Sequence, residues 1–180
     1  MKNELFHHGV KGQKWGVKNG PPYPLVRITK GSEEASNEIY KTLSKREKNL
    51  IMGESPNNGN PPRKFIRKGE AKYLVDQILV KYGDTPVAAL DVWNQDHGEA
   101  AISIMTRNDP KYRGKGYADM AAKEVGKRFV EKYKDINVLE WGAWDVNEPS
   151  KHLAEKNGFK FKDWHDPGGE KYVVYEKRKK

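Results

Sequence analysis

The chain has 180 residues, and its hydrophobic content of 36%, with five Trp and nine Tyr, excludes a wholly disordered protein and suits one domain with a packed core. The absence of cysteine excludes disulfides, thiolate metal sites and a cysteine nucleophile, and it fits a reducing cytoplasm. Because no apolar run approaches the roughly 20 residues of a membrane span, and the N-terminal residues lack the apolar centre of a signal peptide, we expect a soluble, cytoplasmic protein without membrane contact.

The net charge of +9 is carried by the ends of the chain rather than by its middle. Residues 1–65 contain twelve Lys or Arg against six Asp or Glu, residues 66–176 contain eighteen against nineteen, and residues 177–180 are all basic. Basic tails attract nucleic acid and other polyanions without sequence preference, but a solvated tail that aids solubility is the simpler interpretation. We therefore expect nucleic-acid contact to be nonspecific at most.

Composition divides the chain into a non-regular arm over residues 1–24, a domain over residues 25–176 and a basic tail over residues 177–180. In the arm, HHGVKGQKWGV (residues 7–17) resembles a short motif near the ends of structural and accessory proteins of tailed bacteriophages. This resemblance implies a phage or prophage source and phage structural proteins as partners, with the protein in the host cell or on the virion. The alternative is a metal site at His7 and His8, but two adjacent His without a third ligand seldom form one.

The domain is expected to begin with a short strand and one long helix. Residues 25–28 predict a strand that ends at Gly31. From Ser32 to about Met52, Ser32 can cap a helix and apolar residues recur at roughly helical spacing, which predicts a single helix. The Pro-, Asn- and Gly-rich residues 53–62 predict a loop.

A meander of three strands follows, predicted at residues 73–80, 87–93 and 100–105. The next predicted helix covers residues 114–133, where Tyr117, Ala121, Val125 and Phe129 share one face. A strand at 136–144, a short helix at 150–156 and two strands at 159–161 and 172–175 complete the order, the last two joined by a turn at 166–169.

Two segments carry the chemical signal. The loop YRGKGYA (residues 112–118) opens the long second helix, where backbone N–H groups and the positive end of the helix dipole favour a phosphate, with Arg113 and Lys115 adding charge. About thirty residues later, Asn147 can cap a short helix that Asn157-Gly158 can end. A Gly-rich turn that opens a helix for steric reasons alone is the alternative for the first segment.

Together, the RGKGYA turn and the pattern N-x-x-S-x-x-L-x-E-K-x-G-F (residues 147–159) resemble the two main motifs of the GNAT family, the acetyl-CoA-dependent N-acetyltransferases. The resemblance covers about residues 70 to 177. It implies a mixed α+β fold in which a central, mostly antiparallel sheet is splayed at the cofactor cleft and flanked by helices.

The resemblance also implies acetyl-CoA (CoA) as the cofactor, with pantetheine inserted between the splayed strands and the pyrophosphate held by backbone amides. The alternative for Asn147 and Ser150 is helix capping alone. The cofactor-binding residues it implies are Thr106, Arg107, Asn108, Arg113, Gly114, Lys115, Gly116, Tyr117, Ala118, Asn147 and Ser150.

The reaction implied is attack by an unprotonated primary amine on the acetyl thioester, which needs a base for the ammonium and an acid for the leaving thiolate. Many family members supply the acid from a Tyr in the last helix, but the position here is Ala154. Family members often place a Glu a few residues before the end of the strand that leads into the phosphate loop, but residues 102–105 here are Ile-Ser-Ile-Met, without a carboxylate. Glu140 on the following strand is the first candidate for the base, and Asp91, Glu99 and His152 are the others, although a surface or idle role is the alternative for each.

The acceptor is not specified by the sequence. Trp93, Trp141, Trp144 and Trp164 fall in or beside the predicted sheet, where they either line a small-molecule site or belong to the core. We expect the acceptor to be an amine of a small molecule or of a protein. Three hypotheses remain: an active N-acetyltransferase, a GNAT-fold binding protein with little catalysis, and a phage accessory protein, which is compatible with either.

Overall fold

The computed structural model describes residues 26–55, 59–166 and 169–180. The predicted arm of residues 1–24, with its His7-His8 pair and its phage-like motif, lies outside the described residues, as do Leu25 and Pro167-Gly168 of the predicted final turn.

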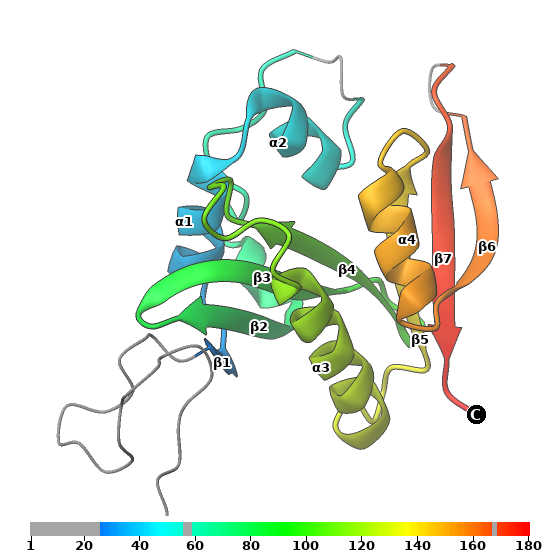
Figure 1. Cartoon of the computed structure of the whole chain (residues 1–180). Coiled ribbons are helices and arrows are strands. Elements are labelled where there is room, and N and C mark those ends of the chain that lie inside the picture. The colour runs from blue at the N-terminus through cyan, green and yellow to red at the C-terminus, as the bar shows by residue number, and fades with distance from the viewer. Residues whose placement is uncertain (1–25, 56–58, 167–168) are drawn as a thin grey trace, which may run out of the picture.

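The strands form one mixed sheet in the order β1-β2-β3-β4-β5-β7-β6. Neighbouring strands are antiparallel except β4 and β5, which are parallel. This arrangement, with helices on both sides, confirms the predicted fold class (Figure 1). The strands are β1 (Val26–Lys30), β2 (Leu74–Tyr82), β3 (Thr85–Asn94), β4 (Glu99–Thr106), β5 (Val138–Trp144), β6 (Lys160–His165) and β7 (Tyr172–Arg178).

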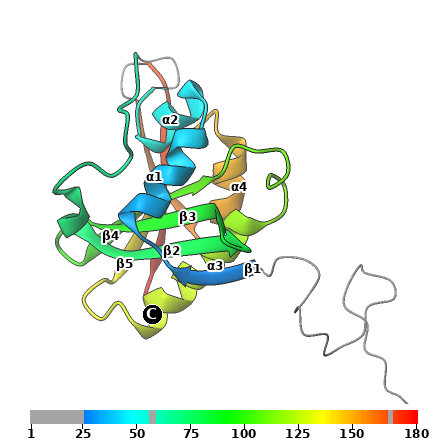
Figure 2. The same cartoon turned by 90° about the vertical axis from the view of Figure 1, so that its left-hand side faces the viewer.

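The helices cover the two faces of the sheet and enclose two hydrophobic clusters. On one face, α3 packs its buried stripe on β2, β3 and β4, and α4 contributes Ala154 to the same cluster. On the other face, Ile39 and Tyr40 of α1 contact the alternate side chains of the same strands, such as Leu79 and Ala89. Figure 2 shows α1 in front of β3 and α3 behind the sheet. The helices are α1 (Glu33–Thr42), α2 (Lys45–Ile51), the short 3₁₀ helix η1 (Glu70–Tyr73), α3 (Tyr117–Glu131) and α4 (Glu148–Lys156).

The single long helix predicted for residues 32–52 is wrong. The predicted cap at Ser32 is confirmed, because its hydroxyl accepts from the Ala35 N–H at 3.2 Å. The helix ends at Thr42, however, and Ser44 is extended, with ψ 163°, where it caps a second helix. Its hydroxyl accepts from the Glu47 N–H while the Glu47 carboxylate accepts from the Ser44 N–H, so local capping outweighs helical spacing here.

Two other predicted boundaries are corrected. α3 begins at Tyr117 rather than Gly114, because Gly114 and Gly116 have φ of 68° and 79°, a left-handed conformation that a helix interior does not allow. β7 continues through Arg178, so Lys177 and Arg178, predicted as part of a basic tail, belong to a strand.

The sheet is open between β4 and β5. These strands pair only from Glu99 with Val138 to Ile102 with Trp141, after which β4 continues to Thr106 and β5 to Trp144 without pairing to each other. The predicted splay is therefore confirmed, and it leaves polar backbone groups of both strands facing a gap.

No helix among the described residues has the length and apolar character that crossing a membrane requires.

Candidate functional site

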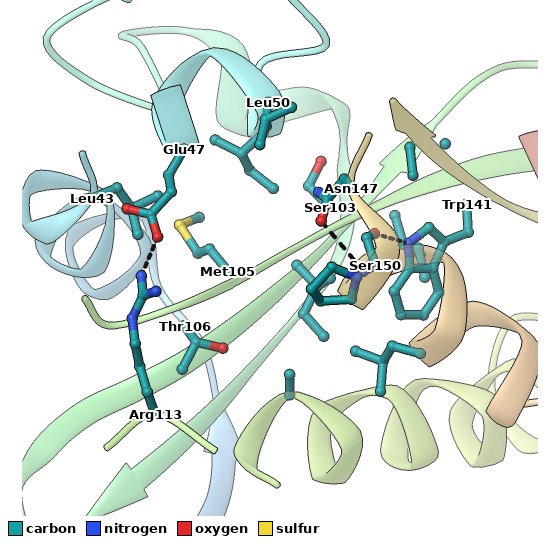
Figure 3. Close-up of a pocket in the computed structure, with 18 of the residues that line it drawn as sticks. Leu43, Glu47, Leu50, Ser103, Met105, Thr106, Arg113, Trp141, Asn147 and Ser150 are labelled. Atoms are coloured by element: carbon teal, nitrogen blue, oxygen red, sulfur yellow. Dashed lines mark hydrogen bonds and ion pairs between the residues drawn. The ribbon is translucent and has the colours of Figure 1, made fainter. Parts of the chain in front are cut away.

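A cavity of about 440 Å³ opens where β4 and β5 separate. It runs from the loop before α3 to the helices α1 and α2 on the other face, and Figure 3 shows Leu43, Glu47 and Leu50 across from Asn147, Ser150 and Trp141. The cavity therefore passes through the sheet at the splay. The residues that line it are Leu43, Glu47, Leu50, Ile51, Ile102, Ser103, Ile104, Met105, Thr106, Arg113, Gly114, Ala118, Trp141, Gly142, Ala143, Asn147, Pro149, Ser150, Leu153 and Tyr172.

The loop before α3 presents a run of free backbone donors. The first bond of α3 joins the Met120 N–H to the Gly116 carbonyl, and within the described ranges the N–H groups of Gly114 through Asp119 donate to no acceptor. A β-carbon at Gly114 or Gly116 would meet nothing within 4 Å, so space remains for a ligand beside these groups. Such a run at a helix start suits a phosphate or pyrophosphate.

The side chains of this loop take different positions. Arg113 lines the cavity, but its guanidinium forms an ion pair with Glu47 of α2 (Figure 3). Ala118 also lines the cavity, Lys115 is exposed beside it, and Tyr117 packs in the core instead. The side chains of Lys115 and Tyr117 therefore do not line the cavity, and Gly116 has none to contribute.

The edge of β4 that faces the gap differs from the predicted one. The Arg107 N–H donates to Val87 on β3 and the Asn108 N–H donates to the Thr42 hydroxyl of α1, both at 2.9 Å, so neither faces the gap. Backbone groups alternate along a strand, and those of Thr106 and Ile104 therefore point towards β5. The structure brings Thr106 to the cavity, as expected, together with Ile104, whose position strand alternation alone could have indicated.

The start of α4 forms the opposite wall of the cavity. The Asn147 side chain accepts from the Ser150 N–H at 3.4 Å, which confirms the predicted cap. The Ser150 hydroxyl accepts from the Trp141 indole N–H at 2.9 Å (Figure 3). Ser150 thus joins α4 to β5 and Asn147 caps the helix, while both line the cavity.

The structure does not bring Glu140 to the cavity. Glu140 lies in the part of β5 that is still paired with β4, opposite Ala101, and its carboxylate forms an ion pair with Lys162 of β6. The prediction of Glu140 as the base is therefore not supported, because the strand places it one step before the splay and a neighbouring cation holds it.

The other candidate bases are also absent from the lining. Asp91 is buried under α1, where Ser36 and Gln77 donate to its carboxylate; burial, opposed by these bonds, raises the pKa of Asp91 to about 6. Glu99 starts β4 at the closed end of the splay, and His152 is exposed on α4. Outside the segments that the structure leaves undescribed, no three His, Asp or Glu are grouped to hold a metal.

The lining contains one carboxylate that the sequence did not single out. Glu47 of α2 faces the cavity and accepts from the side chains of Arg113 and Asn108 and from the Ser44 N–H. Burial works to raise the pKa of Glu47, but the bonds from Arg113 and Ser44 outweigh it and hold the pKa below its ordinary value. Glu47 is therefore anionic at neutral pH. The Ser44-x-x-Glu47 capping pattern could have indicated the start of α2, but not that Glu47 faces the cavity.

Ala154 and three of the four tryptophans in the described part of the chain lie away from the cavity lining. Ala154 is fully buried in the core and offers no hydroxyl to the cavity. Trp141 lines the cavity from the core, Trp93 packs beside α1, and Trp144 is buried, with no hydrogen-bond partner for its indole N–H among the described residues. Trp164 is half exposed on β6. Of these four tryptophans, only Trp141 both lines the cavity and packs in the core.

Several solved structures share this architecture. A GNAT-family acetyltransferase from Bacillus anthracis is 18% identical, with 87% of this chain and 96% of that chain covered and a TM-score of 0.63. The ribosomal-protein-S18-alanine N-acetyltransferase from Escherichia coli is 11% identical, with coverage of 86% and 94% and a TM-score of 0.63. RimL, a ribosomal L7/L12 alpha-N-protein acetyltransferase in complex with coenzyme A, is 12% identical, with coverage of 85% and 93% and a TM-score of 0.61.

No protein with a curated description matches the chain. The solved structures show that the fold is shared. A family model described as an acetyltransferase (GNAT) domain matches residues 62–160, which is more than half of the chain. The match spans both strands of the splay, the loop before α3 and all of α4. The family confirms acetyl-CoA as the cofactor expected from the sequence, and the chain belongs to the GNAT acetyltransferase family.

Proposed function

We propose that this protein is an acetyl-CoA-dependent N-acetyltransferase that acetylates a primary amine. The observation that carries the proposal is the continuity of the cavity. Free N–H groups of Gly114 through Asp119 lie at one end, the unpaired edge of β4 lies in the middle, and apolar residues of the α1–α2 layer line the other face. One end suits a diphosphate and the middle suits amide groups that add to a strand edge. The far end is left for an acceptor.

The donor, acetyl-CoA, supplies an activated acetyl thioester. Gly114 through Ala118 would hold its diphosphate with backbone amides, and Ile104 and Thr106 would pair with its pantetheine. Asn147 and Ser150 would contact it from α4. The residues present fit this group, because the donors of the loop have no partner among the described residues and the splay exposes an unpaired strand edge.

The acceptor side combines an apolar wall with one negative charge. Leu43, Leu50 and Met105 supply the wall, and Glu47, which is ion-paired with Arg113 in the absence of an acceptor, supplies the charge. An anionic carboxylate favours the approach of an ammonium group, and water beside it would then take the proton that the amine loses. Two structural relatives are named for acetylating ribosomal proteins, so we propose a protein amine as the acceptor class, ahead of a small molecule.

A second candidate, a GNAT-fold protein that binds acetyl-CoA but transfers little, is favoured by two observations. Glu140 is held by Lys162 away from the cavity, and Ala154 leaves the usual acid position without a hydroxyl. The phage or prophage source and an association with phage structural proteins also remain proposals, which rest on the motif at residues 7–17 alone.

The test is acetyl transfer to a panel of amines, read by mass spectrometry. We expect peptides with a free α-amine to gain one acetyl group in the presence of acetyl-CoA, and we expect the same peptides with a blocked α-amine and no lysine to gain none. Transfer to polyamines or aminoglycosides in place of peptides would contradict the protein acceptor. Absence of transfer to every amine, with CoA still bound, would select the binding protein.

A further inference from the structure

Tyr172 is the tyrosine of β7 that reaches the cavity. It lies opposite Trp144 of β5 and belongs to the residues that line the cavity. Its face of β7 is the face on which Glu176 lies, whereas Tyr175, on the other face, packs in the core and bonds Glu155 of α4. From the sequence, Tyr172 is predicted only as part of a strand.

Gly142 makes room for the Tyr172 hydroxyl. A β-carbon at Gly142 would lie 2.0 Å from the hydroxyl oxygen and 2.6 Å from the ring carbon that bears it, so any larger residue at this position would displace the ring. Gly142 and Tyr172 are diagonal neighbours on one face of the β5–β7 pair, since Gly142 pairs with Val174 and Trp144 with Tyr172. A glycine is thus required here by close approach rather than by backbone angles.

This contact places the hydroxyl at the apex of the splay. Gly142 directly follows Trp141, the last residue of β5 that pairs with β4. Backbone edges of both strands become free from this point, and Ser103 and Ser150 line the same cavity. A group bound between the strands would therefore end beside the Tyr172 hydroxyl.

The Tyr172 hydroxyl holds its proton and is not engaged. Burial and then the negative charge of Glu140 raise the pKa of Tyr172 above its ordinary value, so the hydroxyl is protonated at neutral pH. Within the described part of the chain, no group donates to it or accepts from it. A protonated hydroxyl at the cavity wall can donate to a bound acceptor atom.

We propose that Tyr172 is the proton donor to the leaving thiolate, in place of the hydroxyl that Ala154 lacks. This inference rests on the proposed function. As the amine nitrogen forms its bond to the acetyl carbon, the carbon–sulfur bond breaks and its electron pair passes to sulfur. The Tyr172 hydroxyl gives its proton to that sulfur. The tyrosinate then recovers a proton through water from the nitrogen, which must lose one to become a neutral amide, so no further reactant is needed.

The test is Tyr172→Phe, with Tyr175→Phe as the matched control on the other face of the same strand. We expect Tyr172→Phe to lower kcat about 100-fold, as loss of a general acid does, while calorimetric CoA affinity, the melting temperature and the KM for the acceptor stay close to those of the wild type. We expect Tyr175→Phe to keep kcat within about threefold of the wild type.

A second variant separates a chemical role from a structural one. Site-specific replacement of Tyr172 by 3-fluorotyrosine keeps the ring but makes the hydroxyl more acidic, so the alkaline limb of the kcat profile should move to lower pH. An unmoved limb, or a Tyr172→Phe variant with wild-type kcat, would overturn the assignment while leaving the proposed function intact. A wild type that binds CoA but acetylates no amine would overturn both.

Discussion

The carboxyl of Asp91 has a pKa that burial in the folded protein raises, which its neighbours in the sequence do not indicate. The residue is fully buried on β3, and its carboxylate accepts from the Ser36 hydroxyl at 3.0 Å and from the Gln77 amide at 2.7 Å. Two neutral donors do not offset the loss of water, so burial raises the pKa of Asp91 to about 6. Asp91 is therefore a structural carboxyl that is destabilising when ionised.

Because the pKa of Asp91 is raised in the folded protein, this residue should make the free energy of unfolding fall as pH rises. Below the unfolded pKa of 3.8 the carboxyl is protonated in both states, and as pH rises towards about 6 the unfolded state ionises first. This group should therefore lower the free energy of unfolding progressively over that window, by about 3 kcal/mol in all. We predict that Asp91→Asn, whose amide can still bond Ser36 and Gln77, removes this dependence.

Denaturant unfolding of both proteins at pH 4 and pH 7 measures the effect. We expect the variant to gain stability relative to the wild type between the two values, because groups other than Asp91 titrate equally in both. A difference that stays constant across this range would show that Asp91 titrates in the folded protein as it does in the unfolded chain.

For the helices and strands, the spacing of apolar residues predicted which elements form, whereas side-chain hydrogen bonds determine where one helix ends and the next begins. Tyr117, Ala121, Val125 and Phe129 all proved buried on α3, because an apolar stripe can only face the sheet. The break at Ser44 was missed, because a capping box inside an apolar period depends on side-chain bonds that compete with the helix.

The candidate site was also predictable only in part. The Gly-rich loop and the cap at Asn147 mark local backbone geometry, which sequence encodes. Glu47 and Tyr172 could not be found in this way, because they reach the cavity from elements more than fifty residues from the loop. The sequence could not show that Glu140 lies outside the cavity lining, since the residue at which β4 and β5 part depends on the register of the sheet.

The capping box of α2 makes a testable contribution to stability. We predict that Ser44→Ala lowers the free energy of unfolding by about 1 kcal/mol, because the Glu47 N–H loses its acceptor. Ser44→Asp is the matched control, since its carboxylate can accept from the same N–H and should preserve stability. Chemical denaturation measures both, and an Asp variant as unstable as the Ala variant would show that capping is not the cause.

On the scale of the whole molecule, the splay connects two layers that the sheet otherwise separates. α3 and α4 lie on one face and α1 and α2 on the other, and the cavity between β4 and β5 is lined from both sides. The Arg113–Glu47 ion pair crosses this opening and joins the loop before α3 to α2. The donor loop and the acceptor wall are thus parts of one continuous site.

The central claim is that backbone amides at the start of α3 bind the diphosphate of CoA, and calorimetric titration with CoA tests it most directly. Gly116→Glu and Gly116→Gln share the strain of a side chain at φ 79° and project into open space, so they differ only in charge. We predict that the wild type binds CoA and that the Glu variant binds at least about tenfold more weakly than the Gln variant, since like charge repels the diphosphate. Equal affinity in the two variants, or no binding by the wild type, would contradict the account.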